Sequence, residues 1–276
     1  TTLRNKRSEN TLRQRILKTN EVMKKGLQMK DDEIHAVYEK WNEGRLQSYL
    51  IEMTGDIFAY KKPGEKYLLL NDIKDEAKAT GTGKWTSQAA MDLGLPVPII
   101  DISVSMRDLS KYKDLRVSAS TMFPGSQQAK YSGSSDKYIP RLEAAYYFGM
   151  VSAYAQGMHL MYHASKEYQY DLNMDRIAKI WRGGCIIRSR FLGDIKTAFD
   201  KNPKLENLLL DDFFRSAVEK AQPSWRRVVA TSVQMGLPIP VFSAALSYFD
   251  GYRQARLPAN LVQAQPAYLG AEHRRS

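Results

Sequence analysis

The chain has 276 residues, 43% of them hydrophobic, and a net charge of +11 from 41 lysines and arginines against 30 acids. This hydrophobic content is enough for a substantial core, and no apolar run reaches the roughly 18 to 20 residues of a membrane-spanning helix. The single cysteine, Cys185, excludes an intrachain disulfide and a thiolate metal cluster. It favours a reducing compartment, either the cytoplasm or an organellar matrix, over secretion, and residues 1–18 lack the apolar stretch of a secretory signal.

The positive charge is distributed along the whole chain, with one denser group in residues 4–18, where Glu9 is the only acid. An excess of this size suits anionic ligands, nucleic acid or a crowded organellar assembly. A solvated lysine-rich surface explains it equally well. Charge alone therefore leaves open a larger protein or ribonucleoprotein assembly, and the N-terminal group fits either a residual transit segment or a first helix.

The first half of the chain is predicted to be helical. Three acids at positions 31–33 precede apolar residues at 3–4 spacing up to Trp41, which is typical of a helix start. Residues 50–58 continue in the same manner. Tyr138–Tyr168 is the longest predicted helix, with Pro140 in its first turn, and its dense apolar positions predict burial on several sides.

The second half is predicted to be helical as well, over 174–199, 213–221, 225–235 and 241–255. Asn202-Pro203 ends the first of these helices. Residues 118–137, rich in Ser, Gly and Lys, predict a connector with a short hairpin, and the tail after Pro258 is predicted to run extended over a surface. Strand signals are few, so the predicted fold class is all-α.

A long-range repeat runs through this pattern. The second half repeats segments of the first at an offset of about 140 positions, and the matching pairs are Trp41 and Trp181, Leu68–Asp72 and Leu208–Asp212, Ala77 and Ala217, Trp85 and Trp225, and Gly94–Pro98 and Gly236–Pro240. Shared patterns at one long offset predict a duplicated supersecondary unit. We therefore expect a single domain over 1–276, a duplicated helical bundle with repeat one at about 8–117, the connector at 118–137, repeat two at about 138–257 and a tail at 258–276. The Gly-Leu-Pro segments of the last pair are predicted turns between helices.

The segment Gly81–Thr86 resembles a phosphate-binding loop at first sight. A true loop of that kind needs Gly where Lys78 stands, and Ser or Thr where Trp85 follows the lysine. A plain helix start is the simpler interpretation, although the free amides of a helix N-terminus can still bind a phosphate. The chain also has no Gly-x-Gly-x-x-Gly motif, so it does not encode a dinucleotide-binding fold of that type.

His159 and His163 share one face of the longest predicted helix. The residues between them lack the glutamate of a zinc-protease motif, and no third ligand suggests itself. Packing or hydrogen bonding is therefore favoured over metal binding, and we predict no metal site.

Four segments give the chain a specific resemblance: Gly81–Thr86, Ile180–Arg188, Phe242–Asp250 and Leu257–Gln265. Across roughly Glu21–Gly270 the chain resembles 6-phosphogluconate dehydrogenase, of which only the C-terminal, all-helical domain is present. The resemblance implies a duplicated helical bundle, an obligate homodimer and a C-terminal tail that reaches into the active site of the partner.

The resemblance also implies an activity. The family oxidatively decarboxylates 6-phosphogluconate to ribulose 5-phosphate with NADP, using a lysine base, a glutamate acid and several cations that hold the phosphate and carboxylate. NADP is therefore expected only if this chain is paired with a nucleotide-binding domain. The resemblance places the acid at Glu9 and substrate contacts at Thr82 and Arg107.

Other positions depart from the family pattern. The base lysine falls at Thr2, a substrate lysine at Thr80, a phosphate-binding arginine at Pro266 and a histidine at Glu272. Losing several charge-assisted contacts weakens binding by orders of magnitude. We therefore favour a non-catalytic helical scaffold, a structural or interaction subunit of a larger assembly. The alternative is the substrate-binding and dimerisation domain of an active enzyme, separated from its nucleotide-binding domain.

Overall fold

The computed structural model describes the backbone of residues 2–77, 81–123, 130–183 and 185–272, and their side chains from residue 11 to residue 268. Within these ranges the chain forms helices, with two isolated β-bridges and no strand, which confirms the predicted all-α class. None of the described helices has the length and apolar character needed to cross a membrane. The helices, in chain order, are α1 (Thr2–Glu21), α2 (Asp31–Glu43), α3 (Tyr49–Ala59), α4 (Thr82–Asp92), α5 (Pro98–Ser110), α6 (Lys113–Met122), α7 (Ser135–Glu167), α8 (Met174–Arg182), α9 (Phe191–Lys201), α10 (Asp212–Gln234), α11 (Pro240–Tyr252) and α12 (Ala259–Glu272).

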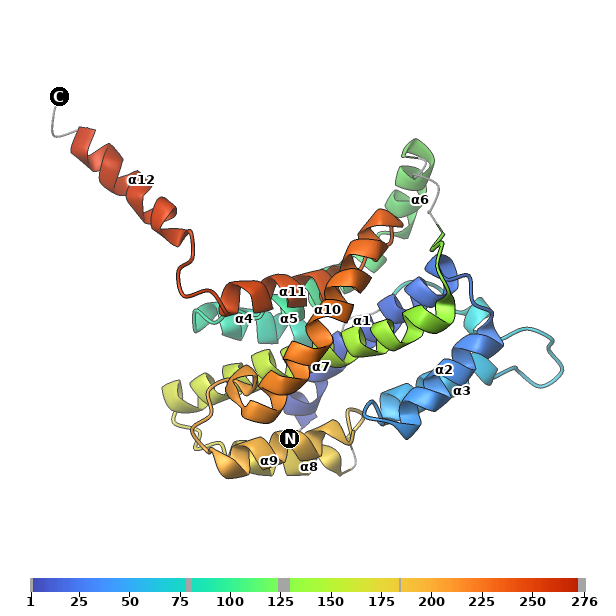
Figure 1. The fold of residues 1–276 in the computed structure, drawn as a ribbon, viewed down its shortest axis with the longest axis horizontal. Helices are drawn as coiled ribbons and strands as arrows, with labels where there is room; N and C mark the ends of the chain where they lie inside the picture. The colour runs from blue at the N-terminus through green and yellow to red at the C-terminus, as the bar shows by residue number, and fades with distance from the viewer. Residues whose placement is uncertain (1, 78–80, 124–129, 184, 273–276) are drawn as a thin grey trace.

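Helix α7 is the centre of the bundle. It runs through the body of the molecule and contacts α1, α5, α10 and α11 (Figure 1). Its ring contacts include Phe148, whose centroid lies 3.6 Å from that of Trp225 on α10, and both side chains are fully buried. The predicted burial on several sides is thus confirmed, because neighbouring helices cover most of its circumference. Pro140 lies in the second turn of the helix, one turn later than predicted.

Helices α2 and α3, whose helical character the apolar spacing predicts, pack against each other as a hairpin beside this core. The first turn of α2 is closed by the Lys30 amide, which donates to the Glu33 carboxylate at 2.7 Å. Ser48 begins α3, where its hydroxyl accepts a bond from the Ile51 amide at 3.3 Å. Trp41 at the end of α2 then packs against Tyr146 of α7, so local capping places an aromatic anchor on the central helix.

The predicted helix over 174–199 is wrong, because the structure divides it into α8 and α9. Helix α8 ends at Gly183, and the segment before α9 pairs with the start of α3. The Tyr49 amide donates to the Arg188 carbonyl at 3.1 Å, and the Arg190 amide donates to the Gln47 carbonyl at 3.0 Å. These long-range backbone bonds replace helical ones, so tertiary pairing overrides the local pattern.

In α10 the prediction was wrong in the opposite way, because two predicted helices are one in the structure. Two helices were predicted, over 213–221 and 225–235, but the structure has one continuous helix that includes Pro223. A proline inside a helix costs about 3 kcal/mol. One buried face continues on both sides of it, from Phe214 and Val218 to Trp225 and Val228. Burying this face against α7 offsets the cost.

Two further predictions need correction. The first residues of the predicted connector belong to α6, and its described part contains no hairpin. The tail does not run extended: Ala259–Glu272 is helix α12, with Pro266 inside it. Ala, Leu and Gln are good helix formers, and local propensity decides where no neighbouring helix covers the chain. Figure 1 shows α6 and α12 projecting from the same side of the body.

The two Gly-Leu-Pro turns are confirmed and have the same local geometry. Gly94 and Gly236 have φ angles of +63° and +70°, in the left-handed region that glycine adopts without strain. The following leucine amides donate to Ala90 at 2.8 Å and to Ser232 at 2.9 Å. Other repeat positions differ, because Trp225 is fully buried whereas its counterpart Trp85 is 53% exposed. The duplication of the whole unit and its boundaries stay predictions.

Gln156 of α7 provides a test of the packing. Its buried Oε1 accepts a bond from the Ile99 amide at 3.1 Å, an amide in the first turn of α5 that has no partner within its own helix. We expect Gln156→Met to leave this buried amide unpaired and to lower the free energy of unfolding by about 1 to 3 kcal/mol in denaturant titrations. The exposed control Gln254→Met is expected to change it by less than about 0.5 kcal/mol. Equal effects of the two substitutions would contradict the capping role.

Candidate functional site

The glycine-rich segment forms the start of a helix. Gly81 has φ +86° and precedes α4, and the Trp85 amide donates to the Gly81 carbonyl at 3.0 Å. Thr82 is buried in the first turn, and its carbonyl accepts a bond from the Thr86 hydroxyl at 2.8 Å. A side chain at position 81 would meet both the unfavourable φ and the ring of Trp85, 3.5 Å from an added Cβ. Glycine is therefore needed for this entry into α4.

Arg107 lies half-buried in the last turn of α5. The start of this helix is fixed by Gln156, and its end is fixed by Ser110. The Ser110 hydroxyl donates to the Arg107 carbonyl at 2.7 Å and accepts a bond from the Ala77 amide at 3.0 Å. Through this one hydroxyl, the segment that leads toward Thr82 is attached to the turn that carries Arg107.

An ion-pair cluster stabilises the same part of the molecule, the corner formed by the start of α4 at Thr82 and the end of α5 at Arg107. Asp75 accepts bonds from Lys113 at 2.6 Å and from Arg116 at 3.0 Å, and Arg116 also donates to the Ser110 carbonyl at 3.1 Å. These four residues are here called the Asp75 clamp. The bonds from Lys113 and then from Arg116 lower the pKa of the Asp75 carboxyl to about 2. Sequence analysis missed the clamp, because residues about forty positions apart in an exposed charged stretch look like ordinary solvated surface.

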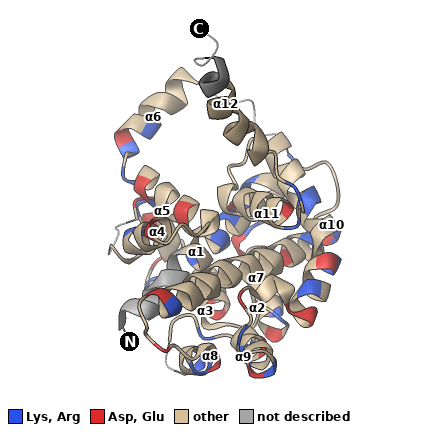
Figure 2. Cartoon of the chain, turned by 90° about the vertical axis from the view of Figure 1, so that its left-hand side faces the viewer, with Lys and Arg blue, Asp and Glu red and all other residues tan. Residues whose placement is uncertain are grey.

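The three helices that carry the predicted site residues lie together. Helix α1 contacts both α4 and α5, and α4 contacts α5 (Figure 2). The side chain of Glu9 on α1 lies outside the described residues, as do Thr80 and the side chain of Glu272. Pro266 is described, and it lies in the exposed helix α12, which extends away from the bundle beyond α11.

The described part of this corner supports binding better than proton transfer. Thr82 supplies a hydroxyl and Arg107 a guanidinium, which suit a hydroxylated or anionic ligand. An arginine stays protonated in proteins, so Arg107 cannot act as a base near neutral pH. Lys84 is exposed in the first turn of α4 and adds positive charge.

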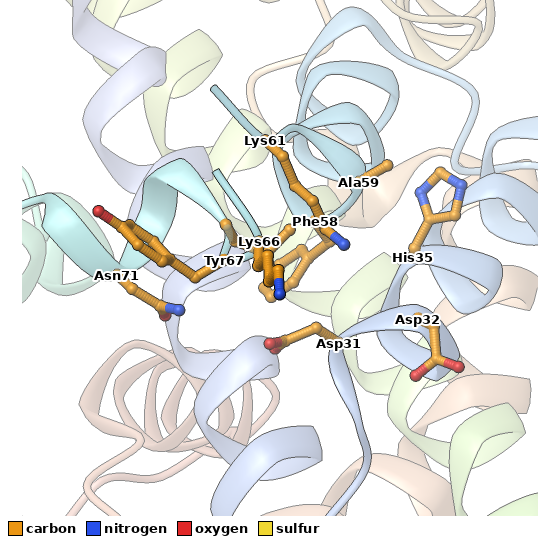
Figure 3. Close-up of a pocket in the computed structure, with 10 residues that line it drawn as sticks. Asp31, Asp32, His35, Phe58, Ala59, Lys61, Lys66, Tyr67 and Asn71 are labelled. Atoms are coloured by element: carbon orange, nitrogen blue, oxygen red, sulfur yellow. The ribbon is translucent and has the colours of Figure 1, made fainter. Parts of the chain in front are cut away.

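A separate cavity of about 440 Å³ lies between the first turn of α2, the end of α3 and the loop over 60–72. Figure 3 shows Lys61 and Lys66 of the loop above Asp31 of α2, whereas the carboxylate of Asp32 points away from the two lysines. Asp31 is already paired with Lys24 at 2.7 Å. None of the predicted site residues lines this cavity, and its mixed charges do not select a ligand of one sign.

The histidine pair on α7 forms packing and hydrogen-bond contacts. The rings of His159 and His163 lie edge to face with centroids 4.4 Å apart, and His159 Nδ1 lies 2.8 Å from the Glu206 carbonyl oxygen. Burial, and then the proximity of His159, lower the pKa of His163. Among the residues that the structure describes, no three His, Cys, Asp or Glu side chains are grouped to hold a metal ion.

Comparison with known proteins gives one consistent family. The family described as 6-phosphogluconate dehydrogenase, C-terminal domain, matches residues 8–275. The chain is similar to decarboxylating 6-phosphogluconate dehydrogenases from Homo sapiens, with 47% identity over 94% of this chain and 53% of the relative. For Schizosaccharomyces pombe the identity is 50%, over 94% of this chain and 52% of the relative. The chain thus spans about half the length of the curated relatives it matches.

Comparison with a solved structure supports the same family. The Plasmodium falciparum 6-phosphogluconate dehydrogenase, studied in its apo form and with its cofactor NADP+ and its substrate 6-phosphogluconate, superimposes with a TM-score of 0.94 at 37% identity. The match covers 98% of this chain and 58% of that one. At this identity the likeness extends beyond the general helical architecture to the family.

The Asp75 clamp can be tested through the amide it protects. We expect Asp75→Asn to weaken the pairing with Lys113 and Arg116 and to increase hydrogen exchange at the Ala77 amide several-fold near neutral pH. Asp92→Asn, at an exposed position, is the matched control. Because the pKa of Asp75 is lowered, the clamp is fully formed above the ordinary aspartate pKa of about 4 and is lost as pH falls through about 2. Unchanged exchange at Ala77 in Asp75→Asn would contradict the clamp.

Proposed function

The chain belongs to the 6-phosphogluconate dehydrogenase family, in which it corresponds to the C-terminal domain, and we propose that it is a non-catalytic member that serves as a helical dimer scaffold. In this proposal the helical packing of the family is retained, whereas most of its cationic substrate contacts are gone. The chain would act as a structural or interaction subunit of a larger protein assembly. Its single buried cysteine, Cys185, suits a reducing compartment, the cytoplasm or an organellar matrix.

One observation carries the proposal. At the position where the family resemblance expects a phosphate-binding arginine, the exposed helix α12 has Pro266, which offers no side-chain donor. In the sequence, Thr80 and Glu272 likewise replace a lysine and a histidine, and Glu272 places a negative charge where an anion should bind. Each lost charge-assisted bond is worth about 1.5 to 3 kcal/mol, so binding falls roughly tenfold to a hundredfold per contact.

The residual site is incomplete for the reaction of the family. Thr82 and Arg107 remain as substrate contacts, and Glu9 remains as the acid that the resemblance assigns. The base lysine is replaced by Thr2, so the proton of the sugar hydroxyl has no assigned acceptor. NADP is not assigned to this chain and would enter only with a nucleotide-binding domain.

Two projecting helices support a homodimer. Helices α6 and α12 leave the bundle on the same side (Figure 2). Large apolar side chains are exposed on both helices and at Phe123, directly after α6. The most exposed are Leu115 at 67%, Met122 at 75%, Phe123 at 77%, Leu261 at 65%, Val262 at 65% and Tyr268 at 66%. Apolar groups on helices that no other described part of the chain covers suit burial against a second copy, and closed two-fold dimers are the commonest assemblies. A ribonucleoprotein partner gains no support from the family and is not part of the proposal.

The alternative is that this chain is the substrate-binding and dimerisation domain of an active NADP-dependent 6-phosphogluconate dehydrogenase. The retained corner of Thr82 and Arg107, held by the Asp75 clamp, favours it. NADP and 6-phosphogluconate added to the native complex distinguish the two functions. A saturable rise in reduced-nicotinamide absorbance would establish the alternative and end the non-catalytic proposal.

Restoring the family residues tests the lost site. We expect the unmodified chain to show no saturable binding of 6-phosphogluconate at low millimolar concentration in calorimetric titrations. The triple variant Thr80→Lys, Pro266→Arg and Glu272→His should gain at least about a hundredfold in affinity, because it restores three contacts to the anion.

Two controls make this test specific. The first control is the variant Glu219→Gln, Gln234→Lys and Gln254→Lys. It raises the net charge by 3, as the restored triple variant does, but at exposed positions elsewhere. It should bind no better than the unmodified chain. Adding Arg107→Leu to the restored variant should reverse its gain. Micromolar binding by the unmodified chain, or no gain on restoration, would reject the explanation.

The dimer is tested by sedimentation. We expect a species of about twice the 31.5 kDa chain mass at micromolar concentration. Removing residues 259–276, or introducing Leu115→Glu on α6 with Phe123→Glu directly after it, should shift the equilibrium toward monomer, because each change removes exposed apolar contacts. Val233→Glu, at an exposed position on α10, is the control. A stable monomer of the unmodified chain would exclude the homodimer.

A further inference from the structure

The cavity of about 440 Å³ beside the α2–α3 hairpin has the dimensions of a binding site for a small molecule. Its walls are the first turn of α2, the end of α3 and the loop over 60–72 (Figure 3). Small-molecule sites typically have volumes of about 300 to 1,000 Å³ and combine an apolar lining with a few polar groups. The side chains around the cavity therefore indicate the class of ligand that it suits.

The loop that forms one wall is held by its own contacts. Lys61 pairs with Leu68 in an antiparallel β-bridge, which brings the two ends of the loop together. Lys62 forms an ion pair with Asp72 at 2.8 Å, outside the cavity. These contacts fix the backbone on both sides of the loop. The wall is thus already formed before any ligand binds.

Two lysines on this wall have no counter-charge. Lys61 and Lys66 line the cavity, and neither forms an ion pair or a side-chain hydrogen bond with any residue that the structure describes. Both ammonium groups lie on the same side of the cavity in Figure 3. Two neighbouring ammonium groups without partners favour a carboxylate or another anionic group between them.

The α2 side of the cavity carries the opposite charge. Asp31 lies below the two lysines in Figure 3, and no ion pair joins it to either of them. Its Oδ1 accepts a bond from Lys24 at 2.7 Å, in a pair whose side chains are 33% and 45% exposed. Such an exposed pair contributes little to stability. The carboxylate of Asp31 can therefore accept a further ammonium group, and it repels a ligand that is only an anion.

The floor between the two charged sides is apolar. Phe58 and Leu68 belong to the main hydrophobic core, and Ala59 lies beside them in the lining. Phe58 also stacks on Tyr38, with ring centroids 6.0 Å apart. A floor anchored in the core in this way is rigid, and it offers burial to an apolar side chain of a ligand.

We propose that this cavity binds a small zwitterion of the α-amino acid class that has an apolar side chain. The carboxylate of the ligand would pair with Lys61 and Lys66, its ammonium group with Asp31, and its side chain would lie on the floor at Phe58. A simple anion would meet Asp31, and a simple cation would meet the two lysines. A ligand with both charges is complementary to both sides. The site is independent of the proposed scaffold function.

The direct test is titration of the full chain with leucine, followed by NMR chemical shifts of the Tyr67 and Asn71 amides at the cavity. Three related compounds each lack one feature: N-acetylleucine lacks the ammonium group, leucinamide lacks the carboxylate, and glycine lacks the apolar side chain. We expect leucine to bind at least about tenfold more tightly than each of them. Equal affinity for any of the three, or no shift at these amides with leucine at about 20 mM, would overturn the proposal.

Substitutions test the two charged sides separately. Lys61→Gln with Lys66→Gln should lower the affinity for leucine about tenfold and remove the preference for leucine over leucinamide. Asp31→Asn should remove the preference over N-acetylleucine. Lys24→Gln should raise the affinity for leucine, although it also removes a positive charge, because it frees Asp31. Preferences that survive in the lysine and aspartate variants would reject the assigned contacts.

A matched control separates these contacts from a general effect of charge. Lys40→Gln with Lys74→Gln removes two positive charges from exposed positions outside the cavity. It should change neither the affinity for leucine nor the preferences among the four compounds. A loss of affinity equal to that of the Lys61 and Lys66 variant would contradict the site. The comparison of ligands on the unmodified chain needs no substitution, so a variant that fails to fold does not affect it.

Discussion

The long central helix α7 must be buried, and the other helices are arranged to cover it. A 33-residue helix that is apolar around most of its circumference is stable in water only if other helices cover it. The long α10 provides the largest of these covers, through the contact of Trp225 with Phe148, and it continues past Pro223 to do so. Helices α1, α5 and α11 complete the cover. The positions of the corner at Thr82 and Arg107 follow from it, because α4 and α5 are placed by this packing.

Polar groups inside such a core are stable only with hydrogen-bond partners, and some of them have partners while others do not. Gln156 meets the free amide of Ile99 and thereby fixes the start of α5. Ser110 accepts from Ala77 and donates to the Arg107 carbonyl, which fixes the end of the same helix. Arg15 is the contrasting case, since its terminal nitrogens have no hydrogen-bond partner among the residues that the structure describes.

The segments that resemble the family and the positions that depart from it lie in different parts of the structure, and this difference has a physical reason. The matched segments around Ile180–Arg188 and Phe242–Asp250 pack into the core or bond to distant backbone, as Arg188 does with Tyr49, so that changes there cost stability. Pro266 lies on an exposed helix, where no internal contact depends on the side chain. Under the proposed function, substitution at such a position would remove binding while leaving the fold intact. A scaffold that outlasts its substrate contacts is therefore compatible with 47% identity to a decarboxylating dehydrogenase.

The helical class, the central helix near Tyr138–Tyr168 and the turns at Gly94 and Gly236 could be predicted from the sequence, because apolar periodicity and glycine conformation are local properties. The substrate contacts at Thr82 and Arg107 stay predictions from the family resemblance. Three features required the folded structure: the separation of α8 from α9, the continuation of α10 through Pro223, and the pairing of Asp75 with Lys113 and Arg116. Each of these depends on contacts between residues distant in the chain. Such contacts leave no periodic signal, because packing energy is gained only when the helices have already come together.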